Sequence, residues 1–252
     1  VSIRTVNSDN VNTKLVPNNR YAKVLGIEWD DIRDKLVFRL NEIFKDEADI
    51  QPTKRNILSI ISTIYDPVGY LQPVTIQLKI LFQEICKLKV GWDDVIDVRK
   101  TKWDSVCNHL NSLQEIVIDR CYFVYNFYDP IVTYHLHGFS DSSLAAYAAC
   151  IYLKCISKSG NVSVKFITAK SRVVPLKKSF TIPRLELLGN YILSRLMSTV
   201  YESLSSEVII SSYFCWTDSQ ISLAWIKATD QEFKTFVENR VNAIRKLVAP
   251  RL

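Results

Sequence analysis

Three carboxylates stand in sequence contexts from which one metal site could be assembled. Asp141 ends a strand-like run, Glu186 lies one turn into a helical pattern, and Asp218 follows an apolar strand pattern and precedes another helix. Strand ends and the first turn of a helix can converge on one point, but carboxylates held close together repel one another. Divalent cations remove that repulsion, and a pair of them can catalyse phosphodiester cleavage. The three acids therefore suggest a two-metal site for phosphodiester chemistry.

The elements that must position these carboxylates follow the order strand, strand, strand, helix, strand, helix. Pro183 suits the first turn of the long helix that carries Glu186. The strands show alternating or continuous apolar patterns, and the helices show apolar residues at helical spacing. Strands are expected at 131–139, 145–155, 162–169 and 208–217, and helices at 183–204, 219–227 and 233–247.

The chain before residue 131 has a different pattern. Residues 1–19 are polar and rich in Asn, which predicts a disordered or extended lead. Two strands are predicted at 21–29 and 35–40, followed by a helical block. Its helices are expected at 53–64 with Thr53 as the cap, after Pro73, and at 98–113. The helix after Pro73 is expected to bury a face made of Ile76, Ile80, Leu81 and Ile85.

Composition and charge restrict the class of protein. The chain has 252 residues, 48% of them hydrophobic, and no apolar run reaches the roughly 18 residues of a membrane span. Residues 131–252 hold 15 Lys and Arg against 8 Asp and Glu, a net charge of +7, whereas residues 1–130 have a net charge of −1. A basic half with few acids suits a polyanionic partner, and solubility alone also explains such a charge. The six cysteines form no C-x-x-C pair, so we expect reduced core cysteines and not a zinc site.

Three sequence words around the carboxylates resemble a known family. They are FSDSS at 139–143, IPRLELL at 182–188 and WTDS at 216–219. Their order and their spacings of 45 and 32 residues between the acids resemble the RNase H domains of LTR retrotransposons, above all the BEL/Pao class. Two upstream words, KRNILS at 54–59 and IYDPVGYLQP at 64–73, look like the segment that joins reverse transcriptase to RNase H in those polyproteins.

The resemblance covers roughly residues 20–248 and implies an α+β chain. Residues 20–130 would form a palm-end, thumb and connection-like region of a reverse transcriptase. Residues 131–252 would form an RNase H-like domain, a mixed β-sheet with flanking helices. We expect this domain to be truncated, because the family's last strand and fourth acidic ligand have no counterpart before Leu252. The chain is thus expected to be an internal piece of a Pol polyprotein that also holds reverse transcriptase and integrase.

The same resemblance implies a reaction. Asp141, Glu186 and Asp218 would be the catalytic residues and would hold two Mg²⁺ ions, for which Mn²⁺ can substitute. The reaction would be hydrolysis of the RNA strand in RNA–DNA hybrids during reverse transcription. The implied location is intracellular, in cytoplasmic virus-like particles or alternatively in the nucleus.

Residues expected to contact the nucleic acid form two groups. Ser142, Ser219 and Gln220 adjoin the carboxylates, and Ser219 also suits the cap of the following helix. The second group is basic, and a solvated loop explains it nearly as well as phosphate binding does. Its members are Lys170, Arg172, Lys177, Lys178 and Arg184.

The absent fourth carboxylate leaves two alternatives to a nuclease open. One is a catalytically inactive nucleic-acid-binding module, and the other is a structural fragment that links the polymerase to the rest of the polyprotein. The chain has neither the Tyr-x-Asp-Asp word of a polymerase nor the Asp-Thr/Ser-Gly word of a retroviral protease. His135 and His137 share one strand face, where packing or hydrogen bonding is favoured over metal binding.

Overall fold

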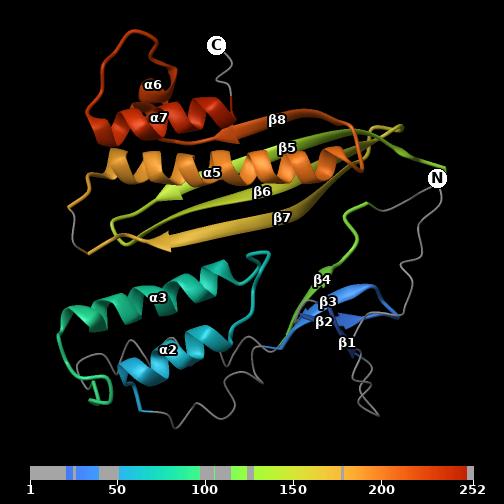
Figure 1. Cartoon of the computed structure of the whole chain (residues 1–252). Coiled ribbons are helices and arrows are strands. Elements are labelled where there is room, and N and C mark those ends of the chain that lie inside the picture. Colours follow the sequence, from blue (N-terminus) through green and yellow to red (C-terminus); the bar gives the residue numbers. More distant parts are fainter. Residues whose placement is uncertain are drawn as a thin grey trace.

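The computed structural model confirms the expected α+β architecture (Figure 1). A mixed four-stranded sheet with helices against it forms from the C-terminal half. A smaller antiparallel sheet and helices precede it. The structure describes residues 21–24, 27–39, 51–96, 105, 115–123, 128–176 and 179–248. None of the helices within these ranges is both long and apolar enough to cross a membrane.

The larger sheet begins with an antiparallel meander of three long strands. These are β5 (Ile131–Ser142), β6 (Ala146–Ser157) and β7 (Val162–Val173). Every second residue of β6 is buried, which is the period of a strand with one face against a core. All three strands lie where the sequence predicts them. Each runs beyond its predicted end, because the β5–β6 and β6–β7 ladders continue to Ser142 and Val173.

The fourth strand of this sheet is added in parallel after a long helix. Helix α5 (Ile182–Ser205) follows β7, and β8 (Ile210–Trp216) then pairs with β5, so the strand order is β7-β6-β5-β8. In Figure 1, α5 lies across one face of the sheet. Pro183 occupies the first turn of α5, as the sequence predicts.

Helix α5 is held to the sheet by apolar residues that recur at helical spacing. Gly138 in β5 permits their close approach, because a Cβ atom there would lie 2.5 Å from Cδ1 of Leu193. Each large side chain buried in this core contributes about 1.5–3 kcal/mol. The residues of α5 in this core are Leu185, Leu188, Ile192, Leu193, Met197 and Val200.

Two shorter helices cover another side of α5. They are α6 (Gln220–Lys227) and α7 (Thr235–Leu247), both close to their predicted bounds. Figure 1 shows them stacked beside α5 near β8. They enclose a second core made of Leu187, Ile226, Val237, Val241 and Ile244.

The smaller sheet is antiparallel and has the strand order β1-β2-β3-β4. Its strands are β1 (Tyr21–Val24), β2 (Ile27–Asp30), β3 (Lys35–Phe38) and β4 (Ile116–Asp119). The prediction of one strand over 21–29 was wrong, because β1 and β2 pair with each other. The four-residue strand β4 was missed, since so short a segment carries too little periodicity.

Two of the described helices, which lie between β3 and β4 in the chain, pack against each other. Helix α2 (Lys54–Thr63) begins as predicted, and Oγ1 of Thr53 accepts a hydrogen bond from the backbone N–H of Asn56 at 3.2 Å. Helix α3 (Gln72–Lys87) follows. Its predicted buried face is only partly right, because α3 contacts α2 on one side and β7 on another. The buried residues of α3 are Thr75, Leu78, Leu81 and Ile85, whereas Ile76 and Ile80 are half-buried.

The segment 66–72 between α2 and α3, here called the clasp, is shaped by one carboxylate. The side chain of Asp66 accepts backbone hydrogen bonds from Gly69, Tyr70 and Leu71 at 2.8–2.9 Å. Gly69 has a φ of +96°, a conformation that side chains with a Cβ atom rarely adopt. The clasp therefore needs both the aspartate and the glycine of the IYDPVGYLQP word.

The clasp attaches the helical block to the larger sheet. The carbonyl of Val68 accepts hydrogen bonds from the backbone N–H of Ala169 at 3.0 Å and from Oγ1 of Thr168 at 2.7 Å. A Cβ atom on Gly69 would lie 2.1 Å from the carbonyl oxygen of Ala169. Farther along α3, Nε2 of Gln83 donates to the carbonyl of Val174 at 2.6 Å. These contacts hold α3 along β7.

Some sequence predictions fall outside the described residues. They are the lead at 1–19, the helix at 98–113 apart from residue 105, and the placement of Lys177 and Lys178. The expectation of core cysteines was wrong for most of those described. The five described cysteines are all free thiols, and of these five only Cys155 is buried.

Candidate metal centre

The fold brings the three predicted carboxylates to one point. Asp141 lies near the end of β5, Glu186 in the second turn of α5, and Asp218 between β8 and α6. One carboxylate oxygen from each lies within 4.8 Å of the others, and within the described ranges no other group of acids, histidines or cysteines is so arranged. Asp141 and Asp218 are exposed, whereas Glu186 is buried. The site is therefore open to solvent on one side and fixed in the protein on the other.

Glu186 is the most constrained of the three. Its Oε1 accepts a hydrogen bond from Oγ of Ser142 at 2.6 Å, while its Oε2 is buried and has no hydrogen-bond partner. Burial raises the pKa of Glu186, the hydrogen bond from Ser142 opposes this, and the charges of Asp141 and Asp218 raise the pKa further. A buried, unpartnered carboxylate oxygen facing two other carboxylates is what a cation would satisfy.

The chemistry of the donor set fits Mg²⁺ or Mn²⁺. All three side chains offer oxygen, which is the ligand atom that these hard cations prefer. The two exposed carboxylates leave room for water and a substrate phosphate, which Mg²⁺ normally keeps among its ligands. The residues present therefore suit a divalent cation site shared by three carboxylates.

A buried chain of polar side chains lies behind the carboxylates. Oγ of Ser140 donates to Oδ1 of Asn190 at 2.7 Å, and Nδ2 of Asn190 donates to Oγ of Ser222 at 2.7 Å. These three residues are 8%, 6% and 0% exposed. They belong to β5, α5 and α6, so the chain fixes the elements that carry Asp141 and Glu186 and the helix that follows Asp218.

Sequence reasoning missed this polar chain. A usable signal was present, because Asn190 stands four residues after Glu186 and therefore on the same face of the helix, amid otherwise apolar residues. Gly189 beside it also brings α5 close to β5. A Cβ atom at Gly189 would lie 3.4 Å from the carbonyl oxygen of Asp141.

The residues predicted to contact nucleic acid beside the carboxylates have mixed positions. The hydroxyl of Ser142 donates a hydrogen bond to Glu186, so in this structure Ser142 is bonded to one of the three carboxylates. Ser219 caps α6 by accepting from the backbone N–H of Ser222 at 3.3 Å. Gln220 is exposed at the first position of α6.

The predicted basic residues do not form one group. Lys170 and Arg172 are exposed on β7. Arg184 lies with its guanidinium 5.6 Å from the ring centroid of Phe236, against α7. Lys177 and Lys178 stand outside the residues that the structure describes. None of the three described members of this group is bonded to the carboxylate cluster.

The paired histidines belong to a row of rings on the sheet face that carries Asp141. His137 stacks on Phe214 with ring centroids 5.0 Å apart, and Nδ1 of His137 accepts from Nε1 of Trp216 at 3.2 Å. Burial, assisted by Lys154 and His135, lowers the pKa of His137. These contacts agree with the packing and hydrogen-bonding role favoured by the sequence.

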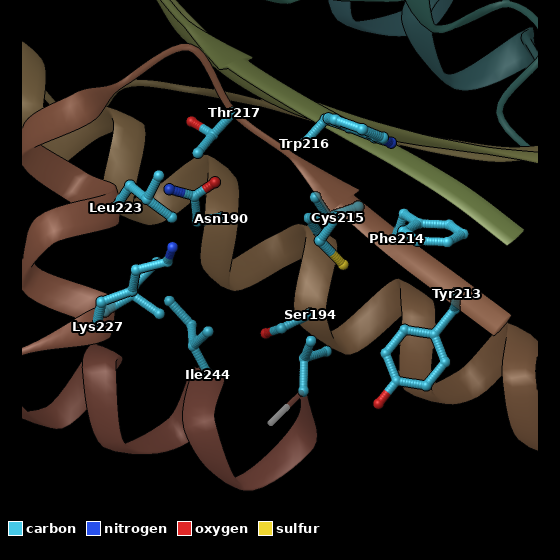
Figure 2. Close-up of a pocket in the computed structure, with 13 residues that line it drawn as sticks. Asn190, Ser194, Tyr213, Phe214, Cys215, Trp216, Thr217, Leu223, Lys227 and Ile244 are labelled. Carbon is cyan, nitrogen blue, oxygen red and sulfur yellow. The ribbon is translucent and has the colours of Figure 1, made fainter. Parts of the chain in front are cut away.

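A groove lies on the other side of β8, between this strand and helices α5, α6 and α7. Figure 2 shows Ser194, Lys227 and Ile244 facing it, with Tyr213 and Cys215 on the strand. Its lining is mostly apolar, and its volume is about 370 Å³. The carboxylates of the metal centre are not among the residues that line it.

The strand order, the position of α5 and the acidic triad define an RNase H-like domain. The chain belongs to the family described as the Pao retrotransposon-like RNaseH-like domain, whose sequence model matches residues 53–219. This match confirms the family expected from the sequence words, and it includes both the clasp and all three carboxylates. None of the curated proteins matches the chain.

One of the similar solved structures covers most of the chain. It is that of a foamy viral protease-reverse transcriptase dRH in complex with ds DNA, with a TM-score of 0.49 and 11% sequence identity. The similarity covers 90% of this chain and 36% of the viral chain. The chain therefore spans about a third of the length of that protein.

Proposed function

We propose that this chain is the RNase H-like part of a retrotransposon Pol polyprotein and hydrolyses the RNA strand of RNA–DNA hybrids. The observation that carries the proposal is the cluster of Asp141, Glu186 and Asp218, with oxygens within 4.8 Å and one buried oxygen unpartnered. Without a cation, repulsion between the carboxylates destabilises such a cluster. A pair of divalent ions in it would be well suited to phosphodiester cleavage. Membership of the Pao family makes retrotransposition the process in which the reaction would occur.

Each carboxylate has a distinct part in this proposal. The hydrogen bond from Ser142 fixes the carboxylate of Glu186 in one orientation, so Glu186 would bind the cations from the buried side of the centre. Asp141 and Asp218 are exposed, so they would bind cations at the surface that substrate approaches. Two bound Mg²⁺ ions, or Mn²⁺ in their place, would supply an activated water and stabilise the leaving oxygen. Ser219 and Gln220, at the start of α6, would contact the hybrid beside the scissile phosphate.

The remaining expected partners belong to the same proposal. The chain would act together with the reverse transcriptase and integrase of the polyprotein. Its place would be the cytoplasmic virus-like particle, with the nucleus as the alternative.

One observation favours a second candidate, a domain that binds nucleic acid without cleaving it. Within the described ranges the centre has three carboxylates, and no fourth acid joins them. Glu238, a late acid in the chain, is bonded instead to the backbone N–H of Phe233 at 3.3 Å and to Nδ2 of Asn242 at 3.1 Å. A three-carboxylate centre holds its second cation less firmly, which would slow or abolish cleavage.

Cleavage of a labelled RNA–DNA hybrid decides between the two. The 252-residue chain is incubated with Mg²⁺ or Mn²⁺, beside Asp218→Asn and a matched control, Glu207→Gln, which removes an acid from the turn after α5. We expect cleavage by the wild type and by Glu207→Gln but not by Asp218→Asn. If folded wild-type protein binds the hybrid and leaves it intact, the domain binds nucleic acid without cleaving it.

A further inference from the structure

Three basic side chains line a small pocket on the opposite side of α5 from the buried polar chain. The pocket lies between β7 and α5 and has a volume of about 120 Å³. Lys170 and Arg172 come from β7, and Arg195 comes from α5. Tyr191 and Thr199 complete its polar lining. Arg195 was not among the basic residues singled out by the sequence.

The period of each element explains why these residues meet. Lys170 and Arg172 are two positions apart on a strand, so both side chains lie on the same face of β7. Tyr191, Arg195 and Thr199 follow one another at intervals of four residues, so they form a row along one side of α5. The row on α5 therefore lies opposite the pair on β7.

None of the acids in the described part of the chain pairs with the three positive charges of this pocket, which belong to Lys170, Arg172 and Arg195. The guanidinium of Arg195 lies 5.9 Å from the ring centroid of Tyr191, a contact that orients it without neutralising it. Glu202, a nearby acid of α5, accepts instead from Oγ of Ser198 at 2.9 Å. Three like charges in one pocket repel one another until an anion binds between them.

We propose that this pocket, here called the basic pocket, binds one phosphate of a nucleic-acid backbone. Guanidinium groups bind phosphate through two parallel hydrogen bonds, and a lysine adds a point charge. The hydroxyls of Tyr191 and Thr199 supply further donors. A pocket of about 120 Å³ has room for a group of this size.

The two sites are close together along the axis of α5, although they lie on different sides of the helix. Glu186 and Arg195 are nine residues apart, which is about 14 Å along the axis of a helix. That length corresponds to the axial rise of about four base pairs. The inference rests on the proposed function for the identity of the polyanion, but its test requires binding only, without cleavage.

The experiment measures binding of a fluorescent RNA–DNA hybrid by anisotropy in EDTA at several salt concentrations. Arg195→Ala and Arg172→Gln are compared with Lys158→Ala, which removes an exposed positive charge at the β6–β7 turn. Losing one phosphate contact should lower the slope of log affinity against log salt by about 0.9. We expect this change and a roughly tenfold weaker affinity for both pocket variants, and a wild-type slope for Lys158→Ala.

Each result bears on the proposal separately from cleavage. Arg195→Ala and Arg172→Gln with the affinity and slope of the control would overturn it, as would a wild type that does not bind the hybrid. If Arg195→Ala does not fold, as judged by circular dichroism, Arg172→Gln decides alone. Titration with inorganic phosphate at constant ionic strength separates the sources. Phosphate binding that depends on Arg195, beside hybrid binding that does not, would show a site for free phosphate and refute backbone binding. If the hybrid binds through the pocket but is not cleaved, the proposed nuclease activity is refuted and the phosphate-binding proposal stands.

Discussion

The acids of the smaller sheet and the acids of the metal centre are compensated in opposite ways. Asp119 on β4 is bonded to Nζ of Lys35, and its other oxygen accepts from Nζ of Lys165 at 2.9 Å. These two lysines lower the pKa of Asp119 to about 2. Among the described residues Glu186 has no lysine or arginine partner, and burial beside two other acids raises its pKa. The first site is neutralised by the protein itself, whereas the proposed function has the second neutralised by a cation from solution.

Removing the buried charge of the metal centre should have the largest effect on activity. Glu186→Gln keeps an acceptor for Ser142 but loses a metal ligand, so we expect hybrid cleavage to fall at least about 100-fold, or about 2.7 kcal/mol. Initial rates over a range of Mn²⁺ concentrations measure the loss. A variant as active as the wild type would show that Glu186 is not a ligand. Asp119→Asn, the matched change at the compensated site, should leave cleavage unchanged.

Adding a divalent cation should stabilise one of these acidic sites and not the other. Binding to the folded state alone stabilises it by about 2.7 kcal/mol at a cation concentration 100 times the dissociation constant. Thermal unfolding with and without Mg²⁺ should therefore show a higher Tm for the wild type and for Asp119→Asn. Glu186→Gln should gain much less. An equal gain in all three proteins would place the cation elsewhere.

Breaking the buried polar chain should weaken cation binding indirectly, because the chain fixes the elements that carry the carboxylates without contributing a ligand. Asn190→Leu leaves Ser140 and Ser222 without their partner, which we expect to cost about 2 kcal/mol in the free energy of unfolding. Urea denaturation measures that cost, and Mn²⁺ titration should show weaker binding. Ser198→Ala, which removes a hydroxyl on another side of α5, serves as the control. Unchanged Mn²⁺ affinity in folded Asn190→Leu would limit the chain to a stabilising role.

The two kinds of acid should respond to pH with opposite signs. The pKa of Glu186 is raised in the metal-free folded state. Its contribution to the free energy of unfolding is therefore fully present below pH 4.5, its ordinary pKa, and is lost as pH rises through the higher pKa of the folded state. Glu186→Gln should abolish that loss in metal-free unfolding curves. Asp119 has a lowered pKa, so its contribution is present above about 3.8 and is lost as pH falls through about 2.

The Asp119 contribution should be the smallest of these effects. Its side chain is 44% exposed, so solvent screens the pair and we expect at most about 1 kcal/mol. Urea denaturation of Asp119→Asn at neutral pH checks this value, with Asp31→Asn in the adjoining turn as the control. High salt should reduce the difference between wild type and Asp119→Asn. A difference well above this value would mean that Asp119 does more than pair with Lys35 and Lys165.

The carboxylate site was predictable because its signals are local. A strand pattern ends near Asp141, a proline opens the helix of Glu186, and Ser219 caps the helix after Asp218. The partners of those residues were not predictable in the same way. The bonds from Asn190 to Ser140 and Ser222 join residues 50 and 32 positions apart, and polar residues of these types occur throughout the chain.

The same limit applies to the basic pocket and to the smaller sheet. Arg195 meets Arg172 only because α5 packs back across the meander, which no short pattern encodes. The division of 21–29 into β1 and β2 depends on pairing between neighbouring strands, and weak alternation does not show where a turn falls. The clasp word was recognised, but its role depends on contact with Ala169, about a hundred residues later in the chain.

That separation has a consequence for the order of folding. Val68 and Gln72 of the clasp and Gln83 of α3 bond to β7 and to the residue after it. These contacts join positions 91 to 100 apart. Distant contacts form late because the intervening chain must first lose its freedom. The β5–β6–β7 meander, whose pairings are local, is therefore expected to form before the clasp closes. On a ribosome, helices α2 and α3 would leave the exit tunnel first and then wait, with one side of α3 uncovered, until β7 had been made.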